Sequence, residues 1–173
     1  MSTSPFATRS IRRLAAVAAG AVALVLAGGG GAGADARCRE VSGRYAEELA
    51  PAGCTSAVGP CIAARYTAGP LRGTFHGVAT TFVTTADTST TGVVLFTTDT
   101  VADVTAWGRH GTLTIKNAGA FHGSGLGEIV DLQTIVGGTG DFTGATGALR
   151  ASGTFDPVRG TGTSTVTGTV CLP

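Results

Sequence analysis

From residue 71 onward, the chain consists of short runs in which apolar and polar residues alternate. These runs include TFHGVATTFVTT, TGVVLFTTDTVADVTA, HGTLTIKN, LGEIVDLQTIV, ALRASGTFD and GTSTVTGTV, and they are bounded by glycine, proline, aspartate or asparagine. A period of two and an abundance of threonine and valine are typical of β-strands. Strands joined by short turns predict an antiparallel all-β domain, either a closed barrel or a sandwich.

The segment before these strands has a different character. Residues 39–49, REVSGRYAEEL, favour one or two helical turns, which Gly43 interrupts. We therefore expect residues 37–70 to form an N-terminal segment stapled by disulfides and residues 71–173 to form the β-structure. Together, residues 37–173 are expected to make up one domain.

Residues 1–36 have the order of a secretory signal peptide. Arginines come first, an apolar run from Leu14 to Ala27 follows, and small residues complete the segment. Cleavage after Ala36 fits the rule of small residues at alternate positions, and Ala34 offers a second site. We therefore expect a secreted, extracellular protein with no membrane association after processing.

Four cysteines follow this leader, namely Cys38, Cys54, Cys61 and Cys171. An even number of cysteines in an exported protein predicts disulfides. Of the three pairings that four cysteines allow, we favour Cys54 with Cys61, which closes a short turn. Cys38 with Cys171 would then tie the two ends of the domain together. No Cys-x-x-Cys pair occurs and the histidines are not at ligand spacing, so no zinc site is expected.

The charge of the chain argues against a nucleic-acid partner. The formal net charge is +1 at pH 7, and Lys116 is the only lysine. Proteins that bind nucleic acids gather lysine and arginine on one face. We therefore expect no nucleic-acid partner, and the sequence predicts no cofactor.

The stretch IVGGTGDFTGATG, residues 135–147, invites comparison with phosphate-binding loops. Its glycine spacing is one residue too long for a dinucleotide fingerprint, and it lacks the lysine of a Walker loop. We predict instead a tight turn between two strands, in which Gly138 and Gly140 have positive φ angles and Phe142 is buried beneath the turn. The glycines of this structural turn are Gly137, Gly138, Gly140, Gly144 and Gly147.

The strand before this turn carries two candidate acids. A period of two places Glu128 on one face with Val130 and Leu132, and Asp131 on the other face with Ile129. A carboxyl group in an apolar lumen has a raised pKa and can serve as a general acid or base. We favour Glu128 as the inward, catalytic candidate, because its face is otherwise apolar or small. The alternative places Asp131 inside.

The turn IVGGTGDFTGATG also carries a family resemblance. Together with HGTLTIKNAGAFHGSGLGEI and the terminal GTVCLP, it resembles secreted bacterial proteins of the allene-oxide-cyclase-like group. The same turn is similar to one in plant dirigent proteins and allene oxide cyclases. The resemblance covers residues 71–173 and implies an eight-stranded antiparallel closed barrel with a lumen, and a homo-oligomer, often a trimer in the plant members. It transfers no catalytic residue, because GEIVDLQTIV lacks the acidic and aromatic pattern of the plant cyclases.

This resemblance favours a protein that binds an apolar small molecule in its lumen. His76 and Trp107 join Glu128, Val130 and Leu132 as candidates to line that lumen. One alternative is a cofactor-free cyclase or isomerase, or a dirigent-type guide of coupling reactions. The other is a non-enzymatic structural or cell-surface module. An inward acid in a cavity above about 300 Å³ would favour the enzyme, and a lumen filled by its own side chains would favour the module.

Overall fold

The computed structural model of the protein describes residues 37–84 and 92–173. The expected signal peptide, residues 1–36, lies outside the described residues. The elements of the described part are β1 Arg37–Leu49, β2 Cys61–Ala68, β3 Arg72–Thr84, β4 Val93–Ala106, β5 Arg109–His122, β6 Gly127–Gly138, the 3-10 helix η1 Gly140–Phe142, β7 Thr146–Asp156 and β8 Thr161–Leu172.

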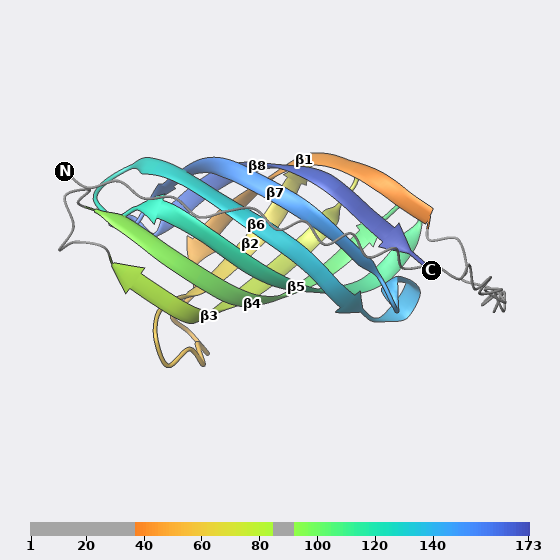
Figure 1. The fold of residues 1–173 in the computed structure, drawn as a ribbon, viewed down its shortest axis with the longest axis horizontal. Coiled ribbons are helices and arrows are strands. Elements are labelled where there is room, and N and C mark those ends of the chain that lie inside the picture. Colours follow the sequence, from red (N-terminus) through yellow and green to blue (C-terminus); the bar gives the residue numbers. More distant parts are fainter. Residues whose placement is uncertain (1–36, 85–91) are drawn as a thin grey trace, which may run out of the picture. The chain divides into compact units, whose positions relative to one another are not determined.

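The strands form a closed antiparallel barrel (Figure 1). Each strand pairs with the next one along the chain, and β8 returns to pair with β1 over almost the whole length of both strands. This confirms the expected fold class, an all-β barrel of eight antiparallel strands. Closure leaves no free sheet edge and divides each strand into side chains that face the lumen and side chains that face outward.

The N-terminal part of the barrel differs from the expectation. Residues 37–49 are a strand and not helical turns, because Val41 and Tyr45 recur on the face that is buried in the lumen. The expected division at residue 70 is also wrong, since β1 and β2 are two of the eight barrel strands. The described chain from β1 to β8 therefore forms one barrel.

Two disulfides hold the barrel, and both predicted pairings are confirmed. Cys38 and Cys171 occupy directly paired positions of β1 and β8, so their disulfide crosses the seam that closes the barrel. Cys54 and Cys61 close the connection between β1 and β2. The first bridge spans 133 residues of sequence and the second spans 7.

The inward side chains form two hydrophobic clusters along the lumen. The larger cluster fills the end of the barrel where the β6–β7 turn lies, and it includes Leu71, Leu113 and Phe142. The smaller cluster consists of Val94, Phe121, Ile129 and Phe155, with Leu49, Phe82 and Phe96 packed against it. Between the two clusters the lumen carries polar side chains, which make the candidate site.

The glycine-rich turn between β6 and β7 closes one end of the barrel. Phe142 is fully buried within η1, as predicted, and Gly140 has a φ angle of 59°. Gly138 does not have a positive φ angle, so that part of the prediction is wrong. A side chain at Gly138 is excluded by close approach instead, because its Cβ would lie 2.6 Å from the Phe142 carbonyl oxygen. The glycines thus permit the backbone conformation and the close approach that this turn requires, and Phe142 adds a buried side chain to the core.

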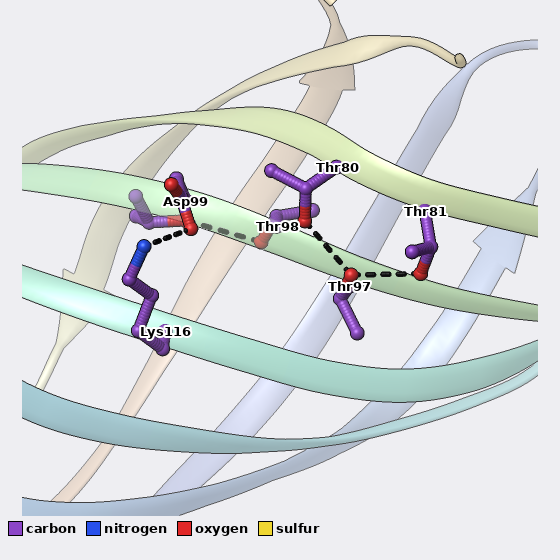
Figure 2. Close-up of polar contacts among 7 residues, drawn as sticks. Thr80, Thr81, Thr97, Thr98, Asp99 and Lys116 are labelled. Atoms are coloured by element: carbon purple, nitrogen blue, oxygen red, sulfur yellow. Dashed lines mark hydrogen bonds and ion pairs between the residues drawn. The ribbon is translucent and has the colours of Figure 1, made fainter.

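A β-bulge in β3 changes which residues face the lumen. The pairing of β3 with β4 shifts between Ala79 and Thr81, so that two residues of β3 lie opposite one residue of β4. The hydroxyl of Thr97 is hydrogen-bonded to the hydroxyls of both Thr80 and Thr81 (Figure 2), with distances of 2.8 Å and 2.7 Å between the oxygens. Beyond the bulge, Phe82 packs against the smaller cluster inside the lumen.

We predict that Gly140→Val destabilises the protein by more than about 1 kcal/mol, because a β-branched residue at positive φ is strained. A Cβ at Gly140 would also lie 2.7 Å from the His110 carbonyl oxygen. The matched control is Gly137→Val, where a Cβ meets nothing within 4 Å. Urea unfolding of both variants measures the difference, and equal stability of Gly140→Val and wild type would contradict this account of the turn.

We also predict that the two disulfides contribute unequally. Loop-closure entropy assigns about 5 kcal/mol to the bridge across the seam and about 2 kcal/mol to the short one. The double variant Cys38→Ala with Cys171→Ala should therefore unfold at a clearly lower urea concentration than Cys54→Ala with Cys61→Ala. A reversed order would show that closure of the seam does not depend on its disulfide.

Candidate functional site

A cavity of about 170 Å³ lies in the lumen among the polar residues and the smaller cluster. Pro60, just before β2, and Pro157, just after β7, border it, so the cavity reaches the barrel end opposite the glycine-rich turn. We call this end the mouth. Phe121 lies near the mouth with its ring centroid 5.3 to 6.0 Å from those of Phe155, Phe82 and Phe96. The apolar part of the site is therefore mainly aromatic.

The cavity wall also carries a set of polar side chains from four strands. We call this set the polar belt, and it consists of Glu47, Thr98, Thr100, Asn117 and Asp131. The hydroxyls of Thr98 and Thr100 lie 3.2 Å apart and form one hydrogen bond with each other. The carboxyl and amide groups remain as the chemically distinctive members of the belt.

Asp131 on β6 is held by two neighbouring amides. Asn117 Nδ2 donates to Asp131 Oδ2 at 3.1 Å, and Gln133 Nε2 lies 3.3 Å from both carboxylate oxygens. Burial raises the pKa of Asp131, and the hydrogen bonds from the two amides oppose that rise. The bond to Asp131 also fixes the Asn117 amide, so its oxygen is left as an acceptor.

Glu47 on β1 is the second inward acid. Burial, together with a smaller effect of the negative charge of Asp131, raises its pKa to about 7. Its Oε1 atom is buried without a hydrogen-bond partner among the described residues, and so is Asn117 Oδ1. A buried acceptor without a donor is costly unless a ligand or a proton satisfies it.

Two tyrosines complete the surroundings of the acids. Tyr45 and Tyr66 pack with Phe75, and Tyr45 stands edge-on to Phe75 with ring centroids 5.1 Å apart. Burial raises the pKa of both phenols, and the charge of Asp131 adds to the effect. Every arginine and lysine that the structure describes is exposed, so no basic side chain compensates the two acids.

The structure decides between the two faces of β6. Ile129, Asp131 and Gln133 point into the lumen, whereas Glu128 is exposed on the outer surface. Val130 and Leu132 are 45% and 53% exposed, so the prediction that they line the lumen with Glu128 is wrong. The alternative face holds the inward acid. The prediction failed because the lumen beside this part of β6 is lined by polar side chains, so the face that carries Gln133 is the buried one.

His76 and Trp107 do not line the cavity either. His76 is exposed on β3 and borders an open hollow on the outer surface of β1 to β3. Trp107 lies in the two-residue turn between β4 and β5, with a φ angle of 52°, and packs on the larger cluster. The Arg39 guanidinium sits 5.4 Å from its ring. Trp107 therefore covers the end of the barrel that is remote from the mouth.

Sequence reasoning missed Glu47 and Asn117. Glu47 was hidden because its segment was expected to be helical, although Val41, Tyr45, Glu47 and Leu49 share a period of two. No feature of the sequence marked Asn117 as a site residue, apart from its position between alternating apolar residues of β5. Only the barrel register brings these residues together with Asp131.

Comparisons with known proteins add no further assignment. The chain matches no protein-family model, no curated protein and no solved structure. Among residues 37–84 and 92–173, no group of three or more histidine, cysteine, aspartate or glutamate side chains is arranged to hold a metal ion. In that same part of the chain, no helix is long and apolar enough to cross a membrane.

We predict that the stability of the protein falls as the pH rises from 4.5 towards 7, by about 3 kcal/mol at most from Glu47. In this range the native state keeps a proton on Glu47 that the unfolded state has lost, so a rising pH favours unfolding. Glu47→Gln should flatten the fall, and so should Asp131→Asn, because it removes both a raised pKa and a repulsive charge.

The controls for this prediction are Glu48→Gln and Glu128→Gln, whose side chains are exposed on the outer faces of the same two strands. Free energies of unfolding at several pH values between about 4 and 8 provide the measurement. If both control variants flatten the curve as much as the two inward variants, the acids of the lumen are not the cause.

Proposed function

We propose that the protein is a secreted small-molecule-binding barrel that holds a ligand with an apolar body in its lumen. The observation that carries the proposal is the cavity of about 170 Å³, which has phenylalanine rings near its mouth and unpartnered acceptors in its wall. Ligand sites in proteins combine mostly apolar walls with a few convergent polar groups. A lumen of purely structural use would be filled by its own side chains.

Secretion and family are parts of the same proposal. The order of charged, apolar and small residues in 1–36 supports export, and the two disulfides fit an oxidising compartment. The closed eight-stranded barrel and the turn at 135–147 support an allene-oxide-cyclase-like or dirigent-like type. Assembly into a homo-oligomer follows from that type alone.

The size of the cavity bears on which ligand and which activity are proposed. At about 170 Å³ it is close to an apolar cavity of about 150 Å³ that takes up benzene. It is below the size of about 300 Å³ from which typical ligand sites begin. The site therefore fits a small ligand, about one aromatic ring and a short substituent, better than a long-chain molecule.

A cofactor-free isomerase or cyclase is the second candidate, and one observation favours it. Glu47 has a pKa of about 7 and shares the lumen with Asp131. A carboxyl group with a pKa near neutrality can both donate and accept a proton in one reaction cycle. Glu47 would then be the general acid or base, and burial together with the charge of Asp131 would hold its pKa high.

We predict that protein purified from its own secretion medium retains a small molecule that native mass spectrometry detects as a non-covalent adduct. Ile62→Trp should abolish the adduct, because Ile62 lines the cavity and an indole there would fill it. Leu132→Trp is the control, since Leu132 faces outward. Identical adducts on wild type and Ile62→Trp would place the molecule outside the lumen and overturn the proposal.

A further inference from the structure

The polar belt contains two buried acceptors that have no hydrogen-bond partner among the described residues. Glu47 Oε1 and Asn117 Oδ1 are buried and unpartnered, and Asp131 offers carboxylate oxygens to the same cavity. Asn117 is 9% exposed, and its amide nitrogen is already engaged by Asp131, so its free oxygen is a fixed acceptor. A ligand that fits this site supplies several donors at one point.

The charge of the site selects among donor groups. Two carboxyl groups face one cavity, and the described arginine and lysine side chains are all exposed. A neutral hydroxyl supplies one donor and leaves at least one acceptor without a partner. A primary ammonium group supplies three donors together with a positive charge. Burial of two acids of like charge becomes favourable when a cation is placed between them.

The aromatic residues suit the same ligand in two ways. Tyr45, Tyr66 and Phe75 pack together beside the acids, and the faces of such rings attract a cation that has left water. Phe82, Phe96 and Phe121 near the mouth provide a surface for an apolar ring. The part of the cavity at the polar belt thus suits a cationic group, and the part nearer the mouth suits an aromatic ring.

We propose that the lumen binds a small primary amine with an aromatic body, whose ammonium group lies among Glu47, Asn117 and Asp131 and whose ring lies among the phenylalanines near the mouth. This inference rests on the proposed function, and it adds the chemical class of the ligand. It requires the amine to be protonated and both carboxyl groups to be ionised in the complex.

Proton release on binding follows from this arrangement. Glu47, whose pKa is about 7, mostly holds a proton in the free protein below that pH, and the titratable groups that act on it are Asp131 on β6 and Tyr45 on β1. An ammonium group displaces that proton, so the affinity for the amine increases as the pH rises through 7. The increase ends where the amine itself loses its proton.

The test is titration calorimetry with 2-phenylethylamine and its neutral analogue 2-phenylethanol, at pH 6 and pH 8. We expect the amine to bind roughly tenfold or more tightly than the alcohol, and its affinity to increase with pH. Repeating the titration in buffers of different ionisation enthalpy measures the released proton. Glu47→Gln and Asp131→Asn should lose the preference for the amine, whereas Glu48→Gln and Glu128→Gln should keep it.

Each other outcome overturns the inference, and the outcomes separate it from the proposed function. Equal binding of amine and alcohol shows a ligand-binding lumen without selection for a cation. An affinity for the amine that does not change with pH shows that Glu47 releases no proton on binding, and loss of the preference in the outward-facing variants shows that the ammonium group does not bind at the acids of the lumen. Failure of both probes to bind rejects the amine class, and the adducts of wild type and Ile62→Trp then decide separately whether the lumen binds any ligand.

Discussion

Pairing between β1 and β8 is the interaction on which the rest of the structure depends. It joins the first and last strands in one continuous register, from Arg37 opposite Leu172 to Glu48 opposite Thr161, and the Cys38–Cys171 disulfide lies within it. Without this seam the strands would form an open sheet with two free edges and a solvated face. With it, alternate residues of all eight strands are forced into one narrow lumen.

That lumen accounts for the unusual placement of polar groups. Small residues such as Gly77, Gly119 and Ala151 face inward beside the polar belt, so the barrel does not fill completely at this height. Hydrophobic clusters on both sides provide the apolar burial that stabilises the fold. Glu47 and Asn117 can then remain partly unsatisfied, which lowers stability locally and leaves acceptors free for a ligand.

The sequence predicted the parts of this fold that depend on local chemistry. The glycine turn with Phe142 buried beneath it, the strands after residue 71 and both disulfides follow from turn residues, alternation and cysteine spacing. The orientation of β6 did not follow, because both of its faces carry apolar side chains and one acid each. Choosing the more apolar face failed, since Val130 and Leu132 are exposed and the polar face is the buried one.

The first strand was missed for a related reason. Glu47 and Glu48 make the end of β1 resemble a solvent-exposed helix in sequence, and no neighbouring residue indicates that Glu47 faces a lumen. Only the pairing of β1 with both β2 and β8 brings Glu47 to the same cavity as Asp131, which is distant from it in the sequence. The fold could be predicted from patterns within strands, but the site depends on registers between strands.

The bulge at Thr80 and Thr81 means that the pairing register of β3, as well as residue type, specifies the lining near the mouth. The extra residue reverses the phase of β3, so that Phe82 faces inward and Val83 is exposed. If the same residues paired regularly, Thr81 and Val83 would face the lumen instead of Phe82, and a polar and aliphatic surface would replace the aromatic one. A substitution that removed the bulge while keeping the chain length would therefore alter the lining near the mouth at several positions at once.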